Sequence, residues 1–399
     1  MRTFAQMVAT RAHWLALPIA CLLLFPSPWM WLGFLGAPVI WGCRWIARGA
    51  PFPASVVNLP LTILLAMVAF GFAITPAPDL AIATAGQVIA GVTIFFVLTD
   101  YLDSSKHLWN IASMLVLFGV ALALVAPFTV SWSTNKLFGL PAFYEAWWPH
   151  LAEETNPNIL AGALAPIVPI ALALIAQGER RQRMLGAIAL APILLILLLL
   201  QSRGAVFGLA MGLIVWLALY NRWVLPFVPF GILAILAINN AMGAVSFTNL
   251  FYGETGTGSP GTLFQRQDLW LQSLFLIRQS PVFGIGLSGY PRLAPVTWPN
   301  SPAQPGGSPN HAHNLFLQVA LDTGVLGLAA FVAILVLAWR TVWSARHSQP
   351  QRHLTIALCA SLVVLIVHGF GDVIVWGTAK SSIVLWVLLA MAFRIESKG

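Results

Sequence analysis

Residues 184–220 read MLGAIALAPILLILLLLQSRGAVFGLAMGLIVWLALY, an apolar run interrupted only at Gln201, Ser202 and Arg203. A helix that crosses the hydrocarbon core of a bilayer needs about 20 largely apolar residues, so this run is long enough for two. An arginine at the centre of a bilayer costs about 2.5–3.5 kcal/mol even on the lenient scale. A turn at 202–204 would instead leave Arg203 at the membrane interface. The run therefore predicts two membrane-spanning helices, at 184–200 and 204–220.

The composition extends this prediction to the whole chain of 399 residues, of which 59% are hydrophobic and 8% are charged. Soluble domains carry about 25% charged residues, so a water-soluble protein is excluded. The basic N-terminus leads into an apolar run from Trp14, which we interpret as a retained first span. The three cysteines show neither metal-type spacing nor a disulfide framework. We predict an all-α, polytopic integral membrane protein with a single transmembrane domain over 1–399. Its transmembrane helices, about twelve in all, are placed at 14–26, 29–43, 57–75, 80–99, 108–130, 159–177, 184–200, 204–220, 223–240, 314–339, 354–369 and 380–394.

The basic residues predict the orientation of these helices. With the N-terminus inside, 14 of the 20 Lys and Arg residues fall on the inner side and 6 on the outer side. This distribution obeys the positive-inside rule and puts both termini in the cytoplasm. The net charge of +8 is thereby explained by orientation, so nucleic acid is not expected as a partner. Eight of the twelve acidic residues fall on the outer side, where we therefore expect the function.

Two long outer loops are predicted, at 131–158 and 241–313. Within the second loop, the spacing of apolar residues over 262–280 predicts an amphipathic helix that lies on the membrane surface. Arg266 falls in its first turn, where a cation opposes the helix dipole unless an anion docks there. Arg266 is thus either an anion ligand or part of a solvated face with Asp268. Arg203 is likewise either a snorkelling arginine or an anion ligand that faces a cavity.

The stretch SPNHAHNLFLQVALDTGVLGL (308–328) brings two histidines to the start of the predicted 314–339 helix. Asn314 is placed to cap this helix. Together with Gln318 and Asp322 it forms a polar stripe, which in a membrane span faces the bundle interior or a wet cavity. The ordinary pKa of histidine, about 6.5, suits a general base. The His311-x-His313 spacing is compatible with a metal, but no third ligand lies nearby along the chain, so no metal is expected.

The last outer turn, HGFGDVIVWGTAK (368–380), carries Asp372, Trp376 and Lys380. A carboxylate and a tryptophan beside a cavity suit sugar hydroxyls and sugar faces. For Trp376 and Lys380 we favour the simpler interpretation of an interfacial tryptophan belt with a capping lysine.

These motifs together resemble the O-antigen ligase and polymerase superfamily. The resemblance is carried by motifs that occur in the same order, from about residue 155 to 330: Asn156-Pro157-Asn158, Ser202-Arg203-Gly204, Arg266-x-x-x-Trp270, Ser280-Pro281-x-x-Gly284-x-Gly286, His313-Asn314-x-x-Leu317 and Gly324-x-x-Gly327-Leu328. Residues before about 130 match this family only as generic spans.

The resemblance implies an inverting glycosyl transfer on the periplasmic side of the bacterial inner membrane, without metal, ATP or cofactor. The donor would be a glycan on undecaprenyl diphosphate, and the ligase branch would transfer it to a sugar hydroxyl of lipid A–core. Guanidinium groups bind phosphate well, which makes Arg203 and Arg266 the candidates for the leaving diphosphate. His313 is the candidate base, and Asn314 either orients its imidazole or caps the helix. Asn158 and Asp372 are candidates for sugar binding or for shaping the pocket, and no role is expected for His311.

Three alternatives stay open. An O-antigen polymerase would use the same donor with a second lipid-linked glycan as acceptor. A protein O-oligosaccharyltransferase often has an additional C-terminal periplasmic region, whereas this sequence ends at Gly399 soon after the last predicted span. A membrane transporter could line a pathway with Arg203 and Asp372, but the paired repeats that are common in transporters are not evident.

Overall fold

The structure is a computed structural model, and it describes residues 2–24, 28–130, 132, 155–221, 223, 226, 263–299, 310–347 and 351–395. Every regular element in these ranges is a helix, and the only β feature is an isolated bridge between Val130 and Thr155. The helices are α1 (Arg2–Thr10), α2 (Ala12–Leu24), α3 (Met30–Arg48), α4 (Asn58–Ile74), α5 (Pro78–Tyr101), α6 (Ser105–Thr129), α8 (Pro157–Leu164), α9 (Ile167–Gln177), α10 (Arg180–Leu200), α11 (Arg203–Tyr220), α14 (Leu263–Gln279), α15 (Tyr290–Thr297), α16 (Leu315–Ala345), α17 (Arg352–Gly369) and α18 (Ala379–Arg394).

Eight helices of the described ranges, with α8 and α9 taken together, are long and apolar enough to cross a membrane. Two shorter apolar helices, at Trp14–Leu23 and Asn58–Ile74, coincide with further predicted spans. The all-helical fold with membrane-spanning helices is thus confirmed, and the number of twelve stays a prediction. The predicted span at 223–240 and most of the loops 131–158 and 241–313 lie outside the described residues.

The polar interruption at Gln201-Ser202-Arg203 forms the predicted turn. α10 ends at Leu200, and Gln201 adopts a left-handed conformation with φ 49°. Ser202 caps α11 by accepting a hydrogen bond from the Ala205 backbone N–H on its side chain. Arg203 is therefore the first residue of α11, at a helix end rather than inside a span. The span predicted at 159–177, in contrast, is divided at Pro166 into α8 and α9, because proline has no N–H to continue the helical ladder.

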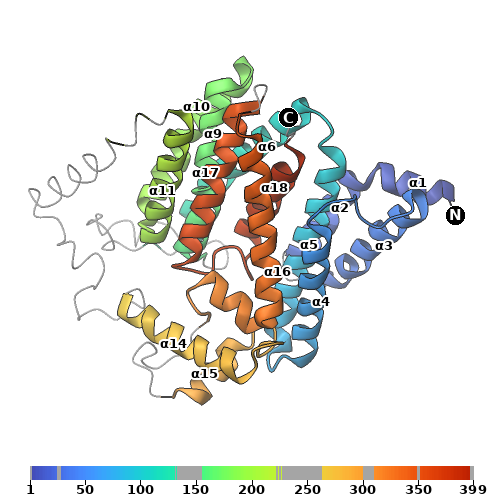
Figure 1. Ribbon diagram of the computed structural model, residues 1–399, viewed down its shortest axis with the longest axis vertical. Coiled ribbons are helices and arrows are strands. Elements are labelled where there is room, and N and C mark those ends of the chain that lie inside the picture. Colours follow the sequence, from blue (N-terminus) through green and yellow to red (C-terminus); the bar gives the residue numbers. More distant parts are fainter. Residues whose placement is uncertain are drawn as a thin grey trace, which may run out of the picture.

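Figure 1 shows α16, α17 and α18 side by side, with α9, α10 and α11 on one side and the N-terminal helices α1–α3 on the other. α17 packs against α9, α11 and α16, while α16 also packs along α4. The described core consists mainly of aliphatic side chains from these helices and from α8, among them Leu164, Leu174 and Leu358. Polar positions such as Gln318 and Asp322 point into this apolar bundle, so their placement requires hydrogen-bond partners inside it.

The predicted amphipathic helix is α14, and Figure 1 shows that α14 and α15 lie across one end of the bundle. The segment after α14 fills a break in α16 at Gly324, whose φ of 69° and ψ of −177° are not helical. There Ile285 N–H donates to the Leu321 carbonyl at 2.7 Å, and Val325 N–H donates to the Pro281 carbonyl at 2.8 Å. A side chain at Gly324 would meet the Val282 backbone, so glycine is required by both conformation and space. These contacts fix α14 against α16.

The helix ends fall into two groups, one at each end of the bundle. At one end, Arg44 pairs with Asp100 at 2.7 Å, Gln351 donates to the Ser105 hydroxyl at 2.6 Å and Arg394 donates to the Leu102 carbonyl at 2.9 Å. These residues all belong to the predicted cytoplasmic side. The opposite end holds α14 and α15, which lie below α16 in Figure 1. Trp270 of α14 donates to the His313 carbonyl, and His313 in turn contacts Asp372. Predicted outer segments that are far apart in sequence thus meet at one end of the bundle.

Candidate active site

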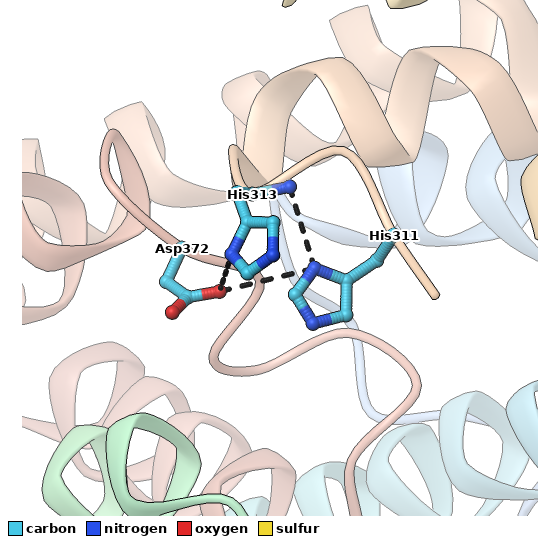
Figure 2. A group of neighbouring side chains, drawn as sticks. All are labelled: His311, His313 and Asp372. Atoms are coloured by element: carbon cyan, nitrogen blue, oxygen red, sulfur yellow. Dashed lines mark hydrogen bonds and ion pairs between the residues drawn. The ribbon is translucent and has the colours of Figure 1, made fainter. Parts of the chain in front are cut away.

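A buried carboxylate, Asp372, lies at the centre of this end of the bundle. It belongs to the turn between α17 and α18, and its side chain is 3% exposed. The carboxylate accepts hydrogen bonds from Asn158 Nδ2 at 2.8 Å and from the Val373 backbone N–H at 2.9 Å. Asn158 donates to Oδ2, whereas Val373 donates to Oδ1. His313 Nδ1 lies 3.1 Å from the same Oδ1, and Figure 2 shows this contact. Asp372 therefore joins the start of α8 to the segment before α16, two sites predicted separately from sequence.

His313 is held beside this carboxylate in a strained backbone conformation with φ 47°. Few residues other than glycine adopt a positive φ, and such positions often occur at functional sites. The indole N–H of Trp270 in α14 donates to the His313 carbonyl at 3.3 Å. Because an ionised carboxylate only accepts hydrogen bonds, we assign the His313 proton to Nδ1, which leaves the Nε2 lone pair available.

Asn314 is the cap of α16, which decides between its two predicted roles. Its Oδ1 accepts hydrogen bonds from the backbone N–H groups of Phe316 at 3.0 Å and Leu317 at 3.1 Å. Its Nδ2 donates to the Phe370 carbonyl at 3.2 Å. Asn314 thus joins the start of α16 to the turn that carries Asp372, and Asp372 rather than Asn314 orients the imidazole of His313.

Arg266 approaches the same carboxylate from α14. Its Nη2 lies 3.9 Å from Asp372 Oδ2, its side chain is 19% exposed, and its guanidinium packs against Gly371. The buried Nε of Arg266 has no hydrogen-bond partner among the described residues. Arg203 lies near enough to Arg266 for the two charges to repel each other. The structure therefore brings both predicted anion ligands to one place, where their repulsion favours a bound anion.

The charges around Asp372 determine its protonation. Burial raises the pKa of Asp372, but the hydrogen bond and charge of His313, followed by the charges of His311 and Arg266, lower it further, so that its pKa lies below the usual range. The pKa of His311 is lowered to about 4, first by burial and then by His313 and Arg266, against an opposing effect of Asp372. At neutral pH the site therefore holds an ionised carboxylate and a neutral His311.

The fold supplies a possible third metal ligand that the sequence spacing did not reveal. The ligand atoms of His311, His313 and Asp372 all lie within 4.8 Å of one another. Two imidazoles and a carboxylate form a donor set that a transition metal accepts. Arg266 close to the same carboxylate adds positive charge that opposes a cation. The arrangement fits an anion site with a histidine base better than a metal centre.

The predicted polar stripe on α16 faces the protein interior. Gln318 accepts a hydrogen bond from the Ala312 backbone N–H at 3.0 Å and donates to Asp322 at 2.9 Å. Trp376 donates its indole N–H to Asp322 at 2.8 Å and is 4% exposed. The interfacial-belt interpretation of Trp376 is therefore wrong, because Asp322 offers this indole a buried acceptor. Lys380, in the first turn of α18, donates to the Thr155 hydroxyl at 2.6 Å.

Three further residues around the site had not been predicted as catalytic or substrate-binding residues. Trp270 and Gln318 hold the backbone on either side of His313, and His368 packs against Gly204 beside Arg203. His368 is 1% exposed. For Trp270 and Gln318 a signal was present, since both belong to patterns singled out in the sequence. His368 begins the predicted outer turn 368–380, but its position beside Arg203 could not be predicted, because it depends on how α11 packs against α17.

No curated protein matches this sequence in the comparison with known proteins. A family model described as O-antigen ligase matches residues 187–332. The matched region includes Arg203, Arg266 and His313, whereas Asn158 and Asp372, which complete the cluster, lie outside it. The match and the apolar helices identify a multi-pass membrane protein, and the match supports assignment of the chain to the O-antigen ligase family.

Proposed function

We propose that this chain is an O-antigen ligase of the bacterial inner membrane, with both termini in the cytoplasm. It transfers a glycan from undecaprenyl diphosphate to a sugar hydroxyl of lipid A–core on the periplasmic face, and it needs no metal, ATP or cofactor. Both substrates are lipids, so the site lies at a membrane surface, with α14 resting on that surface above the bundle.

One observation carries the proposal: a single buried carboxylate contacts both the candidate base and a candidate anion ligand. Asp372 lies 3.1 Å from His313 Nδ1 and 3.9 Å from Arg266 Nη2. A glycosyl transfer from a diphosphate needs a base for the acceptor hydroxyl and a cation for the leaving group. Both groups must act within the length of one sugar, and their shared contact with Asp372 meets this requirement.

The base in the proposed reaction is His313. Its Nδ1–H group donates a hydrogen bond to Asp372, and its Nε2 lone pair takes the proton of the acceptor hydroxyl. The acceptor oxygen forms a bond to the anomeric carbon as the bond from that carbon to the diphosphate oxygen breaks, with inversion. Asp372 then stabilises the imidazolium, and its buried position strengthens this interaction.

The leaving group takes the electron pair and departs as undecaprenyl diphosphate. Arg266 and Arg203 are positioned to bind it, and guanidinium groups hold phosphate oxygens in a bidentate manner. The buried Nε of Arg266, which has no partner within the described part of the chain, offers a further donor to such an anion. Asn158 has its Nδ2 engaged by Asp372, so it contributes to holding the carboxylate and leaves its Oδ1 for a sugar hydroxyl.

The proposal is tested by incubating the purified protein with lipid-diphosphate-linked glycan and lipid A–core, without metal or nucleotide. Glycan on the core is the expected product. Longer lipid-linked chains with an unmodified core would overturn the ligase in favour of a polymerase. Glycan on a protein acceptor would indicate an oligosaccharyltransferase, and flux across vesicles without transfer would indicate a transporter.

The role of His313 is tested with His313→Ala in the same assay. We expect turnover to fall by about 10²–10⁴-fold, the usual contribution of a general base, while donor binding changes little. The matched control is His347→Ala, an exposed histidine in the connection between α16 and α17, for which we expect wild-type turnover. Turnover of His313→Ala close to that of wild type would refute the assignment of the base.

A further inference from the structure

His311 has no role in the reaction proposed above, yet it lies in contact with the base. Its Nδ1 is 3.3 Å from the His313 backbone nitrogen, and the centroids of the two rings are 4.2 Å apart. Figure 2 shows the His311 ring below this peptide group and beside the His313 ring. Because the donor is a backbone N–H, the His311 Nδ1 must be the acceptor.

The conformation of His313 gives this contact its significance. A φ of 47° is unfavourable for a residue with a Cβ, so the surrounding contacts must maintain it. Trp270 holds the carbonyl of His313, and Gln318 holds the N–H of the preceding residue, Ala312. The N–H of His313 itself is held by His311, so both the N–H and the carbonyl of the strained residue have a side-chain partner.

We propose that His311 is a positioning residue, which accepts the His313 backbone N–H and thereby keeps the His313 imidazole aligned with Asp372. This role rests on the proposed function, in which that imidazole is the base. His311 itself does not contact substrate in this scheme and takes no proton.

The geometry around Asp372 agrees with an unprotonated His311 Nδ1 that accepts a hydrogen bond. The His311 Nδ1 lies 3.9 Å from Asp372 Oδ1, too far for a hydrogen bond, as expected for two acceptors. Asp372 Oδ1 instead receives its hydrogen bonds from His313 Nδ1 and the Val373 N–H. The pKa of His311, lowered to about 4 chiefly by burial, keeps its ring neutral and able to accept at neutral pH.

Two substitutions with a similarly branched side chain test the proposal. In His311→Asn, the side-chain oxygen can accept the N–H two residues ahead, as asparagine does in Asx turns. In His311→Leu, the volume is retained but the acceptor is lost. A misplacement of about 1 Å at a reacting group can cost 10²-fold in rate, so we expect kcat of the leucine variant to fall by up to that factor with an unchanged KM for the donor. The asparagine variant should recover most of this loss.

A second measurement does not depend on turnover. In ¹⁵N-histidine spectra of the purified protein, with the signal assigned by its loss in His313→Ala, wild type should show His313 protonated at Nδ1. His311→Leu should show a mixture of the two tautomers, and His311→Asn should restore the wild-type signal. His107→Ala is the histidine control, because this residue contacts Asp103 and Tyr101 at the other end of the bundle.

The outcomes separate this inference from the proposed function. Equal kcat and equal spectra for the asparagine and leucine variants would overturn the positioning role, whether both match wild type or both are impaired. If wild type transfers no glycan to the core, the proposed function fails, and the tautomer of His313 in the two variants still decides whether His311 positions it.

Discussion

The substitution Asp372→Asn tests the centre of the site with the smallest change in shape. The carboxylate accepts from His313, Asn158 and Val373, and it faces Arg266. An amide has one acceptor oxygen and one donor nitrogen, so it cannot accept from the donors on both sides. Wherever its NH₂ group faces His313, the imidazole must move its proton to Nε2, and the lone pair needed for the acceptor hydroxyl is lost.

The size of the effect follows from these contacts. A hydrogen bond to a charged group contributes about 1.5–3 kcal/mol, or about 10- to 150-fold in rate if it is lost only in the transition state. If His313 also loses the tautomer with its proton on Nδ1, the loss in rate approaches the full contribution of a general base, about 10²–10⁴-fold. We therefore expect kcat to fall by about 10²–10⁴-fold. The KM for the donor should stay level or decrease, because Arg266 loses a competing negative charge.

The assay is the initial rate of glycan transfer to lipid A–core at varied donor concentration. The matched control is Asp79→Asn, since Asp79 pairs with Arg292 at 3.1 Å but is 59% exposed. Exposed ion pairs contribute about 0–1 kcal/mol, so this variant should behave as wild type. A kcat of Asp372→Asn within a few fold of wild type would refute the reasoning, as would an increase in donor KM without a loss of kcat.

Three further predictions concern other parts of the molecule. Arg266→Lys should raise the donor KM by about tenfold, the equivalent of one lost charge-assisted hydrogen bond, with a smaller change in kcat. Initial rates at varied donor and acceptor concentrations measure this effect, and a rise in the acceptor KM that exceeds the rise in the donor KM would contradict it. His311 has a folded pKa of about 4 against 6.5 when unfolded, so its contribution to stability is present above pH 6.5 and lost as the pH falls towards 4; thermal unfolding from pH 7 to 4 should therefore be less pH-dependent in His311→Leu. Gly324→Ala should lower the free energy of unfolding by about 1–3 kcal/mol or more, because the conformation is restricted to glycine and the Cβ meets Val282; Gly42→Ala, with open space around its Cβ, is the control in denaturant unfolding.

The sequence predicts the helices well because hydrophobic length and polar interruptions are local properties. The turn at Gln201, the start of α16 at Asn314 and the end of α14 at Gln279 all follow from residues within a few positions of the boundary. The break at Gly324 could not be predicted in this way. Its cause is the segment around Val282, which becomes a neighbour only when α14 packs against α16.

The same distinction explains what the sequence indicates about the site. His313 and Arg266 stand out because polar and charged groups are costly beside membrane spans. The pairing of His313 with Asp372 spans 59 residues, so spacing along the chain cannot reveal it. Burial of Trp376 was missed for the same reason, since its acceptor, Asp322, is 54 residues away.

The shared use of one carboxylate has a consequence for the proposed reaction. During the proposed transfer a positive charge arises on His313 while a negative charge arises on the diphosphate oxygen. Both changes occur among largely buried side chains, where charges interact strongly. Asp372 lies between the two groups that respond to these changes, at 3.1 Å from His313 and 3.9 Å from Arg266. As the diphosphate draws Arg266 towards itself, the carboxylate is left to stabilise the new imidazolium. The two charges are thus compensated together, and neither proton transfer nor departure of the leaving group has to occur against an uncompensated charge.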